Sequence, residues 1–150
     1  MPIKQILADR PMFTVDKEMS VQAAVEYMAE KNIGAVPVME GSRLVGIFSE
    51  RDVLNRVIAR QLSPATTSVA SVMTSNLVVA EADESNESCL RKMKQANCRH
   101  LPVVEGERLV GVISVRDLMQ VEISEATDKI EFLHNYMFHV SSVLEKKYAR

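Results

Sequence analysis

The feature that most constrains this chain is an internal repeat. The segment Pro37–Asp52 returns 65 residues later as Pro102–Asp117, with 11 of the 16 aligned positions identical. The same offset holds without a gap between Phe13–Val57 and Val78–Glu122. Two copies are too few for an open solenoid, which needs about three repeats to bury a continuous core. We therefore expect the copies to pack as a pseudo-twofold pair, so that a site in one copy has a counterpart in the other.

Within each copy, the apolar pattern predicts a strand, a helix, two further strands and a second helix. Ser20 is a good N-cap for the first helix, and residues 35–39 and 44–48 form a hairpin around a glycine turn. The segment Ser49–Asp52 then begins a helix whose apolar positions, Val53, Leu54, Val57 and Ile58, are expected on one face.

These elements predict an α/β fold of the α+β kind, in which two β-α-β-β-α repeats are followed by a C-terminal helix. We place the first repeat at residues 1–62, a linker at 63–68, the second repeat at 69–123 and an amphipathic helix at 124–150. The linker is assigned from its turn residues and its lack of periodicity.

Composition and charge exclude several classes of function. The net charge is −2 and the Lys and Arg residues form no runs, so a nucleic-acid partner is not expected. No stretch approaches the roughly 20 apolar residues of a membrane span, and the first residues do not resemble a signal peptide. Cys89 and Cys98 have neither CxxC nor zinc-ligand spacing. We expect a cytoplasmic protein without a membrane partner or a metal site.

Both copies carry a Ser-x-Arg-Asp motif where the last strand meets the last helix. Ser followed by Asp three residues later is typical of a helix capping box. Capping does not explain Arg51 and Arg116, because a cation in the first turn faces the positive end of the helix dipole. A phosphate at the helix N-terminus would account for the arginines, and the Asp would then be free to bind sugar hydroxyls. The motif favours a nucleotide site, and simple capping remains the alternative.

These motifs resemble the CBS domain family, named after cystathionine β-synthase. The resemblance rests on the Val-Pro-Val and Leu-Pro-Val strands, the Glu-Gly turns and the two G-x-x-S-x-R-D signatures, and it covers about residues 3–122. It implies a tandem pair, or Bateman module, whose clefts bind adenine nucleotides such as AMP, ADP, ATP or NAD(H). It further implies a regulatory, often homodimeric module that is not an enzyme and needs no catalytic cofactor.

Carried over by position, the resemblance assigns roles to residues of both copies. Asp52 and Asp117 would hold ribose hydroxyls, with Ser49 and Ser114 near ribose or phosphate. Arg51 and Arg116 would point toward phosphates. The base and the cleft walls would involve Phe13, Thr14, Ile33, Ala35, Val36 and Pro37 in the first copy, and Val78, Val79, Cys98, Arg99, His100, Leu101 and Pro102 in the second.

The two clefts should differ chemically. Thr14 supplies a hydroxyl where Val79 cannot, and Arg99-His100 replace Gly34-Ala35. The cleft with Arg99 and His100 should favour additional phosphates. Cys98 is interpreted as a small wall residue, and a redox-sensing thiolate is the alternative.

The tail, residues 124–150, lies outside the repeat. Its apolar residues follow alternating spacings of three and four, which is typical of a coiled-coil seam. The seam comprises Ile130, Leu133, Met137, Val140 and Leu144, widened by Phe132, Tyr136 and Val143. We predict that this helix forms a homodimer, and the alternatives are packing on its own repeats or docking of another protein.

Two other functions remain open. In the first, the protein is a constitutive scaffold in which the Ser-x-Arg-Asp motifs only cap helices and the tail recruits a protein partner. In the second, the ligand is S-adenosylmethionine, which lacks the phosphates that would explain the two arginines.

Overall fold

The structure is a computed structural model that describes the backbone of residues 2–148 and the side chains of residues 2–138. The chain divides into two compact units. The first, Met1–Val115, contains the whole first repeat and the second repeat as far as its last strand, and the second, Arg116–Arg150, is helical as far as Tyr148.

The first repeat has the predicted order of elements. It contains β1 (Val15–Asp16), α2 (Val21–Lys31), β2 (Ala35–Glu40), β3 (Arg43–Ser49), α3 (Glu50–Asp52) and the π-helix η1 (Val53–Ile58). The sheet order is β1-β2-β3, with β1 parallel to β2 and β2 antiparallel to β3. The predicted mixed α/β class is confirmed.

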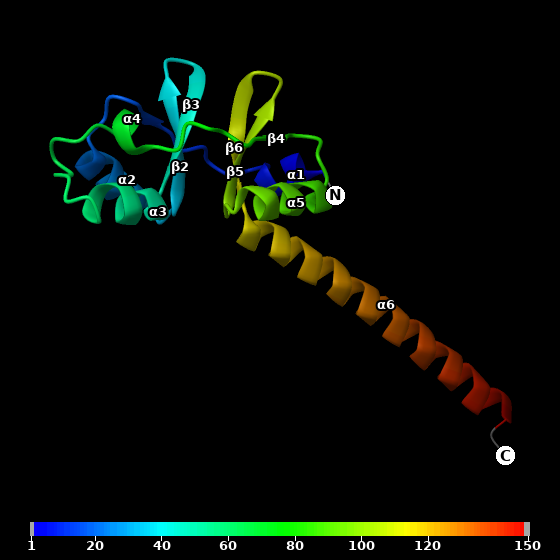
Figure 1. Ribbon diagram of the computed structural model, residues 1–150. Helices are drawn as coiled ribbons and strands as arrows, with labels where there is room; N and C mark the ends of the chain where they lie inside the picture. The colour runs from blue at the N-terminus through cyan, green and yellow to red at the C-terminus, as the bar shows by residue number, and fades with distance from the viewer. Residues whose placement is uncertain (1, 149–150) are drawn as a thin grey trace. The chain divides into compact units, whose positions relative to one another are not determined.

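The second repeat reproduces this topology. Its elements within the first unit are α4 (Val69–Val72), β4 (Ala80–Glu81), α5 (Asn86–Ala96), β5 (His100–Glu105) and β6 (Arg108–Ser114). The sheet order is β4-β5-β6. Both hairpins carry a register shift at the same aligned place, between Val38 and Met39 and between Val103 and Val104. Figure 1 shows the two small sheets, each with its helices beside it.

The repeated helices begin and end with the same residue types. The Ser20 hydroxyl accepts a hydrogen bond from the Ala23 N–H at 3.1 Å, and Ser85 does the same for the equivalent helix. Asn32 and Asn97 end the two helices in the left-handed conformation, with φ of 54° and 51°. Asn adopts this conformation more readily than most residues. The caps therefore fix both helix lengths locally.

The short lead-in helix that precedes each repeat packs against the other repeat, so the two lead-ins are exchanged. The N–H of Ile3, in α1 (Ile3–Leu7), donates to the Glu84 carbonyl of the second repeat at 3.2 Å. Conversely, the N–H of Val69, in α4, donates to the Met19 carbonyl of the first repeat at 2.9 Å. Each lead-in thus packs on the other copy, which ties the two repeats together.

Each repeat has a small hydrophobic core. Phe48 in β3 and Ile113 in β6 occupy aligned positions and are both fully buried. The first core consists of Val15, Val21, Ala24, Met28, Val36, Val38, Phe48, Val57, Val69 and Val72. Since Val69 and Val72 come from α4, the exchanged lead-in is part of the first repeat's core.

The prediction of a single apolar face over residues 53–58 is wrong. Val57 is fully buried, but Leu54 and Ile58 are 63% and 55% exposed. The segment winds as a π-helix, in which the Ala59 N–H donates to the Leu54 carbonyl five residues earlier at 2.9 Å. A π-helical turn contains more residues than the 3.6 of an α-helix, so α-helical spacing does not place these side chains together.

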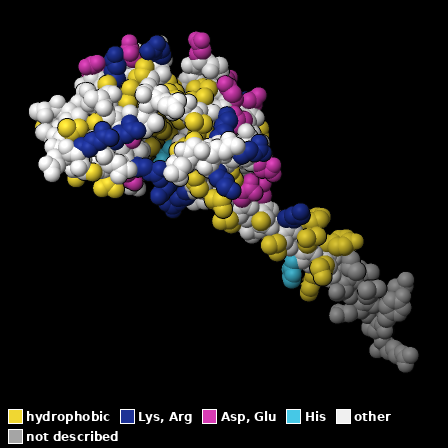
Figure 2. Space-filling model, viewed as in Figure 1, with side chains coloured by type: hydrophobic (Ala, Val, Ile, Leu, Met, Phe, Trp, Pro, Cys, Tyr) yellow, Lys and Arg dark blue, Asp and Glu magenta, His cyan; other side chains and the backbone are white. Residues whose placement is uncertain are grey.

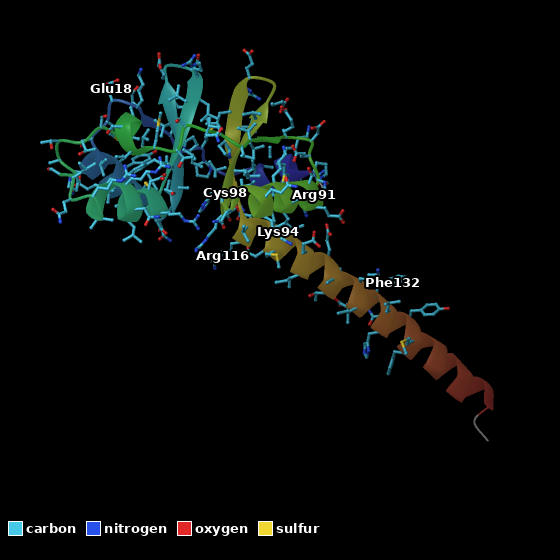
Figure 3. All side chains as sticks on the ribbon, in the orientation of Figure 1. Glu18, Arg91, Lys94, Cys98, Arg116 and Phe132 are labelled. Atoms are coloured by element: carbon cyan, nitrogen blue, oxygen red, sulfur yellow. The ribbon has the colours of Figure 1, made fainter. Side chains whose placement is uncertain are left out.

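Residues 116–148 of the second unit belong to one continuous helix, α6 (Val115–Tyr148). This helix runs without a break through Ser124, where the sequence analysis placed a boundary. The apolar side chains of the predicted seam that the structure describes are exposed, with Ile130 at 68%, Leu133 at 49% and Met137 at 68%, whereas Leu118 near the start of the helix is fully buried. Phe132 extends from the helix in Figure 3, and hydrophobic side chains crowd its described part in Figure 2.

The predicted seam extends beyond the described side chains. Val140, Val143 and Leu144 lie outside them, so the seam is observed only as far as residue 138. Among the helices of residues 2–148, none combines the length and the apolar character needed to cross a membrane.

Candidate functional site

The Ser-x-Arg-Asp motif of the first repeat forms a complete capping box. The Asp52 N–H donates to Ser49 Oγ at 3.4 Å, and the Ser49 N–H donates to Asp52 Oδ2 at 3.0 Å. The Ser49 hydroxyl also donates to Oδ2, at 3.2 Å. Asp52 is 5% exposed, and a buried carboxylate needs such bonds to offset its desolvation. The capping interpretation is therefore confirmed in this copy.

The other oxygen of Asp52 is bonded by a residue that the sequence analysis did not select. Thr74 Oγ1 donates to Asp52 Oδ1 at 3.1 Å, and Arg56 Nε lies 3.6 Å from the same oxygen. Thr74 follows the lead-in α4 and forms an isolated antiparallel bridge with Ile47. Both oxygens of Asp52 are consequently engaged by the protein, one of them by the second repeat.

Arg51 joins the two repeats. Its Nη1 donates to the Asn97 carbonyl at 2.9 Å. Asn97 is the C-cap of α5, where unpaired carbonyls form the negative end of the helix dipole. The position of Arg51 is thus explained without a bound anion, which removes one argument for a phosphate that the sequence analysis had used.

A cleft of about 200 Å³ lies between the repeats. The first repeat contributes four of the predicted wall residues, Phe13, Ile33, Ala35 and Pro37. Val36 instead lies in the hydrophobic core, because successive residues of a strand point to opposite faces. Thr14, also predicted, is half-buried and is not part of this lining.

The sequence analysis missed the remaining walls of this cleft. They consist of Leu7, Arg10, Pro11, Met12, Val110, Gly111 and Val112. The β6 residues were missed because the repeat alignment compares the two copies and does not indicate which strands face each other. A Cβ on Gly111 would lie 3.1 Å from Leu7 Cδ1, so this glycine permits the close approach of α1 to β6. One signal for these missed wall residues was present in the sequence, because Arg10 lies only three positions before the predicted wall residue Phe13.

The predicted residues of the second repeat lie in corresponding places. His100 pairs with Ser114 across its hairpin, as Ala35 pairs with Ser49. Leu101 and Pro102 are buried, Cys98, His100, Ser114 and Val79 are half-buried, and Val78 and Arg99 are exposed. Arg116 and Asp117 belong to the first turn of α6, in the second unit.

Cys98 follows the C-terminal end of α5 and precedes β5 (Figure 3). Burial raises the pKa of its thiol, while the His100 backbone N–H and the Arg51 charge oppose this rise only in part. The thiol therefore remains protonated at neutral pH, which disfavours the redox-sensor interpretation. Burial, reinforced by Glu84, raises the pKa of Cys89 to about 11.

A second cavity of about 300 Å³ lies within the first repeat. Its lining comes from α2, the loop after it, and the helical segment after β3: Val25, Met28, Ala29, Asn32, Ile33, Gly34, Glu50 and Val53. Among the described residues, no group of three or more His, Cys, Asp or Glu side chains could hold a metal ion.

Comparison with known proteins agrees with this architecture. The family model of the CBS domain matches residues 3–59 and 69–124. The CBS domain-containing protein YhcV of Bacillus subtilis (strain 168) is 34% identical over 111 residues, which are 74% of this chain and 79% of that protein.

Solved structures have the same paired fold. A putative signal-transduction protein with CBS domains from Burkholderia ambifaria MC40-6 is 36% identical, with a TM-score of 0.78 over 83% of this chain and 95% of that one. The CBS domain pair of protein MJ0100, solved with 5′-methylthioadenosine and S-adenosyl-L-methionine, is 26% identical, with a TM-score of 0.74 over 83% and 98%. Because both repeats match the family model and the paired fold, this chain belongs to the CBS domain family, as a tandem CBS domain pair.

Proposed function

We propose that the protein is a regulatory module that binds an adenosine-containing ligand between its paired repeats and catalyses no reaction. The observation that carries this proposal is the cleft of about 200 Å³ lined by both repeats. Three of its lining residues, Ile33, Ala35 and Pro37, are ones that the CBS resemblance assigned to base binding, and a fourth, Phe13, was assigned to the wall. The related pair of protein MJ0100, solved with two adenosine derivatives, supports the same class of ligand.

The shape and chemistry of the cleft suit one end of such a ligand. Ligand pockets usually have volumes of about 300–1,000 Å³, so a smaller cleft would take the base and leave any phosphates at its mouth. Ile33, Ala35 and Pro37 offer apolar contacts to a flat base. Arg10 adds a cation to the lining.

The ligand class includes S-adenosylmethionine as well as AMP, ADP, ATP and NAD(H). Phosphates were favoured because Arg51 and Arg116 lacked another explanation. Since Arg51 donates to the Asn97 carbonyl, that preference is weaker, and the adenosine group is the shared element to test first.

Regulation would follow from differential binding. A ligand changes the geometry of the pair only to the extent that it binds one arrangement more tightly. The Arg51–Asn97 bond and the exchanged lead-ins connect the copies, so a ligand between them can alter both. Any coupling between two clefts must be reciprocal.

A thermal-shift panel tests the proposal. We would measure the purified chain with AMP, ADP, ATP, NAD, NADH, S-adenosylmethionine and 5′-methylthioadenosine. A ligand at about 100 times its Kd adds roughly 2.7 kcal/mol of stability. Ala35→Leu fills the cleft and should remove the shift. Ala23→Leu, the same change at an exposed position of α2 outside both cavities, should retain it. The absence of a shift with all seven ligands at millimolar concentration would contradict the proposal.

A constitutive scaffold is the second candidate, favoured by the complete capping box of Ser49 and Asp52. The substitutions Asp52→Ala and Asp117→Ala, one in each copy of the motif, separate the two functions in calorimetry and unfolding experiments. A ligand module should lose binding at this motif. A scaffold should lose only about 0.5–2 kcal/mol of stability, as for other N-terminal cap substitutions.

We further propose that the chain is a cytoplasmic homodimer assembled through the exposed apolar face of α6. Leu133 lies in the predicted seam and is 49% exposed within the chain. Leu133→Glu should yield a monomer in sedimentation velocity, because it would place a charge in the interface. An unchanged sedimentation coefficient would exclude this face as the dimer contact. Asp128→Asn, at a polar position of the same helix, is the control and should leave the sedimentation coefficient unchanged.

A further inference from the structure

We propose that the chain binds one ligand and not two, because the second lead-in is fastened to the first repeat at the place equivalent to the cleft of about 200 Å³. The inference rests on the proposed function and adds to it the number of sites and the residues that close one of them. The internal repeat alone predicts two equivalent clefts. The two lead-ins break this equivalence at their ends, which are residues 7–8 and 73–74.

Both lead-ins are anchored alike where they begin. The Ile3 N–H donates to the Glu84 carbonyl at 3.2 Å, and the Val69 N–H donates to the aligned Met19 carbonyl at 2.9 Å. The next N–H of each lead-in forms a second bond of this kind, in both cases at 3.0 Å. Any difference between the two interfaces therefore arises further along the lead-ins.

The end of the second lead-in is held by four hydrogen bonds. Thr74 and Ile47 exchange two backbone bonds, both of 2.9 Å. Thr74 Oγ1 also donates to Asp52 Oδ1 at 3.1 Å, and Arg56 Nη1 donates to the Met73 carbonyl at 2.9 Å. These bonds fasten residues 73–74 to β3 and to the helical turns that follow it.

The end of the first lead-in lacks these bonds. Leu7 is equivalent to Met73, since each lies against the aligned glycine of the strand that it faces, and Ala8 is therefore equivalent to Thr74. Ala8 has no hydroxyl and is exposed, whereas Thr74 is half-buried. In the part of the chain that the structure describes, no bridge joins Ala8 to Val112, the aligned partner on β6.

The backbone of the second lead-in accordingly lies closer to its strand. A Cβ on Gly46 would lie 3.0 Å from the Thr74 carbonyl oxygen and would clash with the Met73 side chain. At Gly111 the three nearest atoms all belong to the Leu7 side chain, at 3.1–3.6 Å. Leu7 and Gly111 both line the cleft. At the equivalent place in the other interface, the backbone and side chain of the fastened lead-in cover β3.

Hydrogen exchange tests this difference without any ligand. The Ile47 N–H is bonded to the second lead-in, and the aligned Val112 N–H has no such bond to the first. After correction for intrinsic rates, the Ile47 amide should exchange about tenfold more slowly than the Val112 amide, as expected for one net hydrogen bond. Equal protection of the two amides would contradict the fastening of only one lead-in.

Titration calorimetry with AMP and with 5′-methylthioadenosine then counts the sites. The wild type should bind one molecule per chain, and Ala35→Leu, which fills the cleft, should bind none. Two molecules per wild-type chain would overturn the inference while leaving the proposed function intact. If neither compound binds to the wild type or to any variant, both proposals fail.

A variant that releases the second lead-in should gain a site. The changes Arg56→Val, Met73→Leu and Thr74→Ala introduce the residues found at the equivalent positions, Val121, Leu7 and Ala8. This triple variant should bind two molecules per chain, and one when Ala35→Leu is added. If it does not fold, Met73→Leu with Thr74→Ala replaces it.

The matched control makes similar changes away from both interfaces. Arg60→Val with Thr66→Ala, at exposed positions outside both cavities, should leave the count at one molecule per chain. A folded variant with a released lead-in that still binds only one molecule would show that these contacts do not close the second interface.

Discussion

The two repeats share a backbone but stabilise it with different side chains. In the first, Phe13 packs edge-on against Tyr27, with ring centroids 6.1 Å apart and an angle of 81°, and Lys31 Nζ lies 5.4 Å from the Phe13 centroid. In the second, the residue aligned with Tyr27 is Lys92, which forms an ion pair with Glu84.

The ion pair belongs to a wider polar network. Lys92 Nζ also donates to the Val79 carbonyl at 2.8 Å, and the Ser88 hydroxyl donates to Glu84 Oε2 at 2.9 Å. Cys89 Sγ lies 3.7 Å from the same oxygen. At the aligned positions the first repeat has Met19, Ala23 and Ala24. The comparison teaches that caps, turns and strand pairing preserve this fold, while the contacts around them can change from aromatic to ionic.

The largest difference in stability between equivalent substitutions is expected at the two aligned glycines, Gly46 and Gly111. A Cβ on Gly46 would lie 3.0 Å from the Thr74 carbonyl oxygen and would clash with the Met73 side chain. At Gly111 the nearest atoms belong to the flexible Leu7 side chain. We expect Gly46→Ala to cost about 3 kcal/mol and Gly111→Ala about 1 kcal/mol, the two ends of the usual range for overpacking. Urea unfolding measures both losses of stability. Equal losses would show that Met73 and Leu7, the lead-in side chains next to the two glycines, move aside equally easily.

The ion pair should make the stability of the second repeat depend on pH. Burial of Glu84 opposes its ionisation, but hydrogen bonds from Lys92, the Glu81 backbone and Ser88 hold its pKa below the usual 4.5. The stabilisation is therefore complete above about pH 4.5 and is lost as the pH falls through the lowered pKa.

Lys92→Met tests this contribution. It should cost about 2 kcal/mol at pH 7, typical of a hydrogen bond to a charged group, and the loss should shrink toward pH 3. Unfolding curves across this pH range measure the trend. Tyr27→Met, at the aligned position of the first repeat, disrupts no carboxylate pair and should retain the acid dependence of the wild type. A loss from Lys92→Met that is constant with pH would show that packing, and not the ion pair, is responsible.

The smallest effect is a predicted stabilisation at the start of α5. Asn86 is 5% exposed and its Oδ1 has no hydrogen-bond partner among the described residues, whereas the aligned Val21 is fully buried. Asn86→Val should add about 1 kcal/mol by removing an unsatisfied buried carbonyl, and should raise Tm by about 3 °C. The reverse change, Val21→Asn, should lower Tm. A lower Tm for Asn86→Val would mean that the amide oxygen has a partner, such as a bound water.

Much of the fold was predictable because its signals are local. Ser20 and Ser85 cap their helices through atoms three residues away, and glycines occupy both hairpin turns, with φ of 61° at Gly41 and 64° at Gly106. Glycine has no Cβ and therefore adopts such angles at no steric cost. The wall residues Ile33, Ala35 and Pro37 were also predicted, since the family resemblance assigned those positions to the base. The π-helix was not, because its apolar residues have ordinary α-helical spacing.

The sequence by itself determined the twofold repeat, the order of the elements and the caps, because each depends on residues close together in the chain, and the family resemblance added four residues of one cleft. Only the tertiary structure decided that the lead-ins exchange, that Arg51 binds the Asn97 carbonyl and that Thr74 bonds to Asp52. The last two contacts join residues 46 and 22 positions apart. Such pairs are selected by how the two copies pack against each other, and a repeat pattern records only their similarity, not their contacts.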